Sequence, residues 1–74
     1  MDPTEIRSLL EQAFPGARVG VAGDGRHFQA LVVSEAFAGK DLLERHRMVY
    51  AALGERMGQI HALSIRARTP EETG

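Results

Sequence analysis

The longest amphipathic pattern in the chain runs from Asp41 to Gly58, and its apolar residues recur with the spacing of an α-helix. At about 100° per residue these side chains fall within an arc of roughly 120°, so one face of the helix is apolar. Glu44, Met48 and Glu55 fall on the opposite side. A stripe this wide predicts that a sheet or a second helix covers it. The predicted stripe consists of Leu42, Leu43, His46, Val49, Tyr50, Leu53 and Met57.

A second helical pattern precedes it. Residues 2 to 14 carry apolar side chains at helical spacing, with Asp2 or Thr4 as the N-cap, and the pair Pro15-Gly16 ends the pattern. Residues 34 to 40 predict a connection anchored by Phe37. These patterns predict two helices, the second of which is closed by Gly58 as its C-terminal cap.

Three short segments have the patterns of strands. Residues 17 to 22 and 27 to 34 flank the turn signal Gly23-Asp24-Gly25, which predicts an antiparallel hairpin. Residues 60 to 67 predict a third strand. The run Thr69-Pro70-Glu71-Glu72 then resembles a capping box, with threonine as the cap, proline first and glutamate third in a short helix.

The predicted order is αββαβ, an α+β fold with a three-stranded mixed sheet and both helices packed on one face. A long helix between the second and third strands predicts that these strands are adjacent and parallel, with a right-handed crossover. Parallel neighbours begin at the same end of a sheet. Because His27 opens the second strand and His61 the third, the topology predicts that two imidazoles meet at one rim. His46, inside the apolar stripe, is instead predicted to be a structural, neutral and hydrogen-bonded residue.

Composition narrows the function classes. The chain has 74 residues, nine basic and ten acidic, and no cysteine, so it has no disulfide, thiolate ligand or cysteine nucleophile. We expect the protein to be cytoplasmic, because it is a small domain without disulfides and its start does not resemble a signal peptide. We expect no interaction with a membrane, because the chain has no apolar run of about 18 residues. No phosphate-binding loop, metalloprotease motif or dinucleotide fingerprint is present, so we expect no enzymatic activity.

Basic residues raise a second possibility, nucleic-acid binding. Glutamates interleave with them on the predicted helix, and a net charge of −1 does not favour such a partner. The string Gly20-Val21-Ala22-Gly23 has the letters of a K-homology GxxG loop, but it lies at a strand end and carries no basic residue. We interpret that match as accidental. The weak candidates for nucleic-acid contact are Lys40, Arg45, Arg47, Arg66 and Arg68.

Several motifs together resemble the BolA-like family, including the subset with a histidine in the hairpin loop, here His27 after Gly23-Asp24-Gly25. The resemblance extends over nearly the whole chain in the same order and implies a single BolA-like domain, residues 1–74, with a class II-like K-homology fold. The matching runs are Phe37-Ala38-Gly39-Lys40, Arg45-His46-Arg47-Met48-Val49-Tyr50, Ile60-His61-Ala62-Leu63-Ser64-Ile65 and Thr69-Pro70-Glu71.

The resemblance also implies two roles. One is partnership, as a heterodimer, with a monothiol glutaredoxin, in which a BolA-like histidine helps to hold a bridging [2Fe–2S] cluster with glutathione. The other is transcriptional regulation through DNA. His61 matches the ligand position and His27 is the second candidate, although a hydrogen-bonded histidine at a strand start is the simpler interpretation of His61. The isolated protein is expected to hold no cluster, because iron–sulfur clusters need about four ligands. It is also expected to be a monomer or weak dimer.

Overall fold

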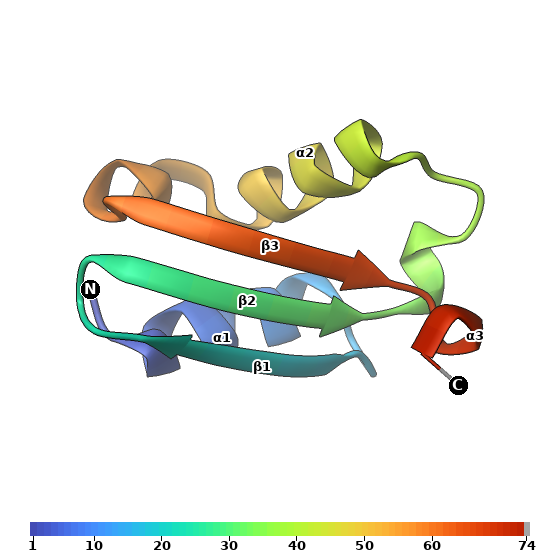
Figure 1. The fold of residues 1–74 in the computed structure, drawn as a ribbon, viewed down its shortest axis with the longest axis horizontal. Coiled ribbons are helices and arrows are strands. Elements are labelled where there is room, and N and C mark those ends of the chain that lie inside the picture. Colours follow the sequence, from blue (N-terminus) through green and yellow to red (C-terminus); the bar gives the residue numbers. More distant parts are fainter. Residues whose placement is uncertain (74) are drawn as a thin grey trace.

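The computed structural model of the protein describes residues 1–73 and has the predicted order of elements (Figure 1). Residues 1–73 form three strands, two main helices, two short 3₁₀ helices and a terminal helical turn. No helix within these residues is long and apolar enough to cross a lipid bilayer. The elements are α1 (Pro3–Ala13), β1 (Arg18–Gly23), β2 (His27–Val33), η1 (Glu35–Phe37), α2 (Leu42–Leu53), η2 (Gly54–Gln59), β3 (Ala62–Arg68) and α3 (Pro70–Thr73).

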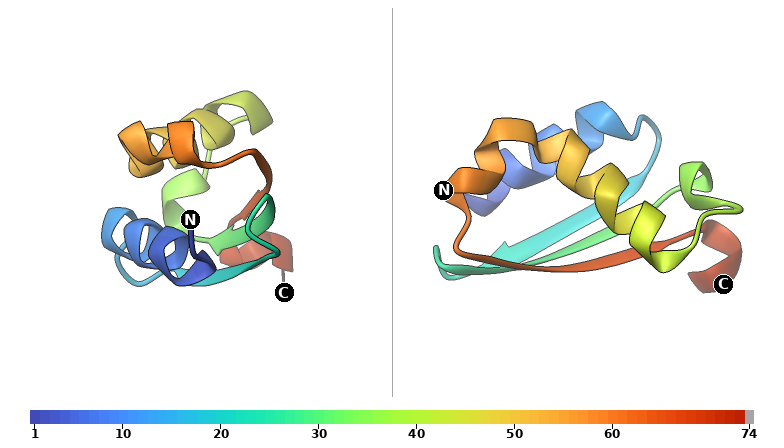
Figure 2. Two further views of the ribbon diagram at one scale, coloured as in Figure 1. Left: turned by 90° about the vertical axis from the view of Figure 1, so that its left-hand side faces the viewer. Right: turned by 90° about the horizontal axis from the view of Figure 1, so that it is seen from above.

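The sheet has the strand order β1-β2-β3, with β1 antiparallel to β2 and β2 parallel to β3. Val21 pairs with Ala30, and Ala30 pairs in turn with Ile65, so these three residues form one row across the sheet. Both α1 and α2 lie on the same side of the sheet, and the helices of residues 1–73 leave the middle of its other face uncovered (Figure 2). The predicted mixed sheet, its parallel pair and the placement of the helices are therefore confirmed.

The core lies between the two helices and one face of the sheet. Alternation along β2 turns Phe28, Ala30 and Val32 inward, and each is almost fully buried. Phe37 anchors the connection after β2 as predicted, because it is fully buried and its ring lies 5.2 Å from that of Phe14. The other buried core residues are Ile6, Leu10, Val33, Val49, Leu53, Ile60 and Ala67.

Helix α2 differs from its prediction in length and in the face that it buries. It ends at Leu53, because Gly54 takes a positive φ of 56° and caps the helix, and the chain continues as η2 rather than to Gly58. Of the predicted stripe, Val49 and Leu53 are buried and Met57 packs partly against the core from η2. The prediction is wrong for three large residues, which are exposed: Leu42 (64%), Leu43 (58%) and Tyr50 (42%).

The physical reason is a rotation of the helix about its axis. Met48 and Ala52, outside the predicted stripe, pack against the core beside Val49 and Leu53. Arg45, on the same side, is fastened to β3 by a hydrogen bond from its Nη1 atom to the Ala67 carbonyl oxygen (3.1 Å). Tertiary contacts with α1 and β3 thus determine which face of α2 is buried. Methionine and alanine are good helix formers that fit both a buried and an exposed position of the helix.

Candidate functional site

The β1–β2 hairpin is closed by Asp24, whose Oδ1 atom accepts hydrogen bonds from the backbone N–H groups of Arg26 and His27, each at 2.9 Å. Gly25 in this turn has a φ of 97°, a conformation that suits glycine. The bond from the His27 N–H, followed by that from Arg26, lowers the pKa of the Asp24 carboxyl below its usual value. The charged carboxylate therefore holds the loop in one conformation and fixes the point at which His27 begins β2.

Gly23, at the end of β1, is required by close approach rather than by its backbone angles. A Cβ atom at this position would lie 2.4 Å from Cδ1 of Phe28 and 2.7 Å from the carbonyl oxygen of His27. Phe28 is only 1% exposed and has no space into which to move. The hairpin can therefore present His27 in this way only because residue 23 has no side chain.

His61 is placed by the residues on either side of it. Ile60 is buried in the core, and the N–H group of Ala62 donates to the carbonyl oxygen of Arg26 at 3.0 Å. That bond joins the start of β3 to the β1–β2 hairpin, and Ala62 is the register partner of His27. His61, between these two fixed points, is exposed at the same rim as His27.

The two imidazoles meet as the topology predicts. Their ring centroids are 5.6 Å apart and the rings are nearly perpendicular, at 77°. The His27 side chain is 68% exposed, and its Nδ1 atom lies 3.9 Å from Oδ2 of Asp24, so the carboxylate lies beside one ring nitrogen. Exposed imidazole nitrogens are suitable ligands for iron, copper, nickel or zinc.

The two imidazoles alone do not make a complete metal site. Among residues 1–73, no group of three or more histidine, cysteine, aspartate or glutamate side chains is arranged to hold a metal ion. An iron–sulfur cluster generally takes four protein or cofactor ligands. Two imidazoles alone would leave such a cluster short of ligands.

The five basic candidates do not form one surface. Arg45 makes a two-pronged ion pair with Glu72 of α3, at 2.6 and 3.0 Å, and its side chain is only 12% exposed. Arg47 is exposed on α2, and Lys40 precedes that helix. Arg66 and Arg68 alternate with the inward residues of β3, and this places them on the opposite face of the sheet.

The Arg45–Glu72 pair closes the C-terminal turn. Its two bonds, followed by a bond from the Thr69 backbone N–H (2.8 Å), lower the pKa of Glu72 to about 2. The bond from Thr69 confirms that Glu72 acts as the third residue of the predicted capping box. The ion pair with Arg45 could not be predicted from the sequence, because the two residues are 27 positions apart in the chain.

His46 is half-buried on α2, away from the sheet rim. Its Nε2 atom is buried and has no hydrogen-bond partner. The prediction that the ring is hydrogen-bonded is therefore wrong at this nitrogen. His46 is not part of the pair at the rim, and its structural role stays a prediction.

Comparison with known proteins identifies the family. The family model described as BolA-like protein matches residues 8–72. Protein BOLA2 of Arabidopsis thaliana is 63% identical over 51 residues, which cover 68% of this chain and 55% of that protein, so the match spans little more than half of the relative's length. The acid stress protein IbaG of Escherichia coli K12 is 42% identical over 74 residues, covering 97% of this chain and 88% of IbaG.

The fold comparison leads to the same family. The structure of a BolA protein homologue from Coxiella burnetii superposes with a TM-score of 0.87 at 41% sequence identity, covering 99% of this chain and 96% of that one. The sequence matches and the fold match lead to the same family. The chain belongs to the BolA-like family.

Proposed function

We propose that this chain is a non-enzymatic adaptor that binds a monothiol glutaredoxin and helps to hold or transfer a [2Fe–2S] cluster bridging the two proteins, with glutathione as a further ligand. The observation that carries this proposal is the pair of exposed imidazoles, His27 and His61, whose rings lie 5.6 Å apart at one rim. Family membership supports it, because His61 occupies the position that the family pattern assigns to a cluster-ligating histidine.

The chemistry of the donor set agrees with a shared cluster. The chain has no cysteine, so thiolate ligands must come from the partner and from glutathione. Histidine in place of cysteine on an iron–sulfur cluster raises the reduction potential. His61 and His27 lie at the surface, where a second protein can reach them, and no large movement of the core is needed.

A DNA-binding regulator is the alternative, and the structure supports it less well. Arg45 is occupied by Glu72, and Arg47 lies on the side of the sheet opposite Arg66 and Arg68. DNA binding through several phosphate contacts would weaken steeply as salt rises. A cluster-bridged complex would depend on iron and glutathione instead, so a salt titration separates the two functions.

The direct test replaces His61 with alanine in the purified protein and reconstitutes the complex with a monothiol glutaredoxin, iron, sulfide and glutathione. Loss of a ligand should alter the visible absorption and circular dichroism spectra and shorten cluster retention at least about 10-fold, since even outer-sphere partners of a metal change affinity 10- to 100-fold. His27→Ala should act in the same direction with a smaller effect.

Gln59→Ala provides the matched control, because Gln59 is exposed and lies two residues before His61. That variant should keep the wild-type spectrum and cluster lifetime. Equal spectra and lifetimes for His61→Ala and wild type would show that His61 is not a ligand. A wild-type protein that forms no complex with the glutaredoxin, with or without cluster, would refute the adaptor function.

A further inference from the structure

The middle of the sheet face opposite α1 and α2 is not covered by any helix of residues 1–73 (Figure 2). The strand register determines which residues this face presents. Gly20 on β1 lies beside Leu31 on β2, which lies beside Arg66 on β3. The next row consists of Ala22, Gln29 and Ser64. These six residues are exposed, and we refer to them as the open face.

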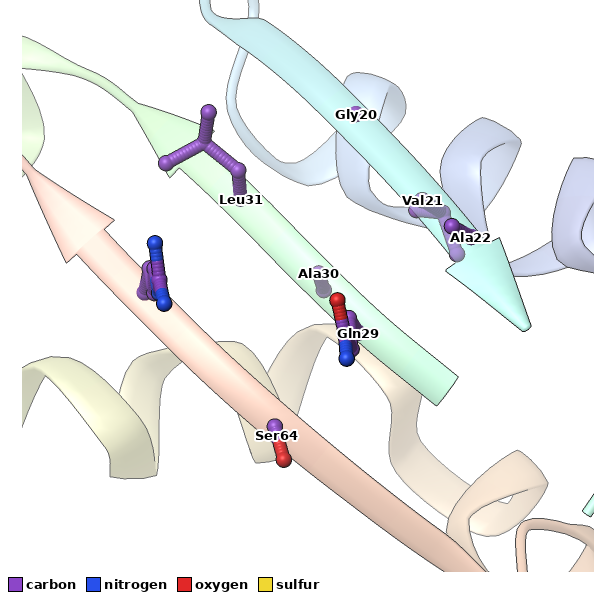
Figure 3. A pocket seen from close by; sticks show the side chains of 8 residues that line it. Gly20, Val21, Ala22, Gln29, Ala30, Leu31 and Ser64 are labelled. Carbon is purple, nitrogen blue, oxygen red and sulfur yellow. The ribbon is translucent and has the colours of Figure 1, made fainter. Parts of the chain in front are cut away.

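The open face is hollow rather than flat. Gly20 has no side chain and those of Ala22 and Ser64 are short, whereas Leu31 and Arg66 are large. These five residues line one hollow with a volume of about 570 Å³ (Figure 3). Leu31 is 37% exposed and is the large apolar residue of this surface. A concave surface with one apolar contact and an arginine at its edge is suited to a protein partner.

This hollow continues to the candidate metal ligand. A second hollow is lined by His27 and Asp24 and shares Ala22, Gln29 and Ser64 with the first. His27 and Gln29 alternate with the inward residues Phe28 and Ala30, so His27 belongs to the same side of the sheet as the open face. A protein that reaches the His27 ring from this side therefore also lies over the open face.

The charged residues at the outward positions of the three strands, Arg18, Arg66 and Arg68, are all basic. Arg18 and Arg68 flank Val33 in the row beyond Arg66, and no outward position of the three strands is acidic. Arg68 donates to the Ala67 carbonyl oxygen and lies near Glu72. Among the three arginines on this side of the sheet, Arg18 and Arg66 are therefore the two with no acidic partner within residues 1–73. These three arginines leave six basic and ten acidic residues elsewhere, a net charge of −4. The outward positions of the strands are therefore basic, whereas the rest of the chain is acidic.

We propose that the cluster-bridging glutaredoxin covers the open face as well as the histidine rim, and that it places carboxylate side chains against Arg66 and Arg18. This inference rests on the proposed function and adds where the partner binds and which charge it presents. Guanidinium groups pair with carboxylates through two parallel hydrogen bonds, which fix the relative orientation of the two groups and stabilise the contact. The open face has no aromatic side chain on which bases could stack, so single-stranded nucleic acid is the poorer occupant.

The test compares two pairs of variants in the full chain, each titrated with the glutaredoxin by calorimetry in cluster-free and cluster-bridged form. Ala22→Trp fills the hollow, and Ala51→Trp adds the same bulk on the exposed side of α2. Arg66→Glu reverses the charge on the open face, and Arg47→Glu makes the same change on α2. Circular dichroism of each variant checks that the fold is kept.

We expect Ala22→Trp to weaken binding at least about 10-fold and Arg66→Glu about 3- to 10-fold, the latter more strongly at low salt. Ala51→Trp and Arg47→Glu should bind as wild type. Should Ala22→Trp fail to fold, Arg66→Glu against Arg47→Glu decides the question alone.

Wild-type affinity for both open-face variants would overturn this inference, and the proposed function would stand if His61→Ala still altered the cluster. Equal weakening by Arg66→Glu and Arg47→Glu would also overturn it, because the effect would then come from net charge. If wild type bound duplex DNA through Arg66 but no glutaredoxin, both proposals would be wrong.

Discussion

Replacing Gly23 with alanine tests whether the hairpin that presents His27 depends on an absent side chain. The new Cβ atom would meet Cδ1 of Phe28 at 2.4 Å and the His27 carbonyl oxygen at 2.7 Å, both well inside van der Waals contact. Neither neighbour can yield easily, because Phe28 is 1% exposed and the oxygen belongs to the backbone. The strand end must shift, and such overpacking typically costs about 1–3 kcal/mol.

That cost is large for this chain. At about 0.05–0.15 kcal/mol per residue, 74 residues give a total stability of about 4–11 kcal/mol. The melting temperature of Gly23→Ala should fall by about 4–8 °C for each kcal/mol lost, measured by circular dichroism. Gly20→Ala is the matched control, since it lies on the same strand with no atom within 4 Å of its Cβ position. That variant should be neutral or more stable by up to about 1 kcal/mol.

The change at Gly23 should also displace the His27 imidazole and so disturb cluster retention in the glutaredoxin complex. Amide chemical shifts of residues 24 to 28 provide a readout that is independent of the cluster. Equal melting temperatures for Gly23→Ala and Gly20→Ala, together with unchanged shifts in this hairpin, would refute the close-approach argument.

Two further predictions concern stability. Leu53→Ala should cost about 2–5 kcal/mol in urea unfolding because Leu53 is 2% exposed. Leu42→Ala, at a residue 64% exposed on the same helix, should change stability by less than about 0.5 kcal/mol, and equal costs would contradict the assigned face of α2. Glu72 has a pKa of about 2 instead of its ordinary 4.5, so its charged form stabilises the fold above pH 4.5 and this contribution is lost as the pH falls from 4.5 towards 2. Glu72→Gln should flatten that part of the stability–pH curve, and parallel curves for variant and wild type would show that the Arg45 pair does not contribute.

The topology could be predicted from the sequence because its signals are local and strong. The Gly23-Asp24-Gly25 turn defined the hairpin, and a long helix between two strands favoured a parallel crossover, which together placed His27 beside His61. The burial of Phe37 was predictable for a related reason, since one large apolar residue in a polar connection needs cover.

The face of α2 could not be predicted from periodicity alone. The helix has more apolar residues than it buries, so two overlapping stripes satisfy the helical period, and the contacts of Met48, Ala52 and Arg45 with other elements decide between them. The hydrogen bonds accepted by Asp24 and the pairing of Glu72 with Arg45 were missed for another reason. Each depends on a precise distance to a partner, and a sequence pattern records residue types rather than distances.

The parallel pairing of β2 with β3 has a consequence for how the protein becomes functional during its synthesis. His27 and His61 are 34 positions apart in the sequence, and they meet only when β3 has added to the sheet after the α2 crossover. The pair of imidazoles is therefore absent from a chain in which only the hairpin has formed. Under the proposed function, a core substitution that leaves only a fraction of the chains folded would therefore weaken the apparent affinity for the cluster in proportion to that fraction, even if the substituted residue lies far from His27 and His61.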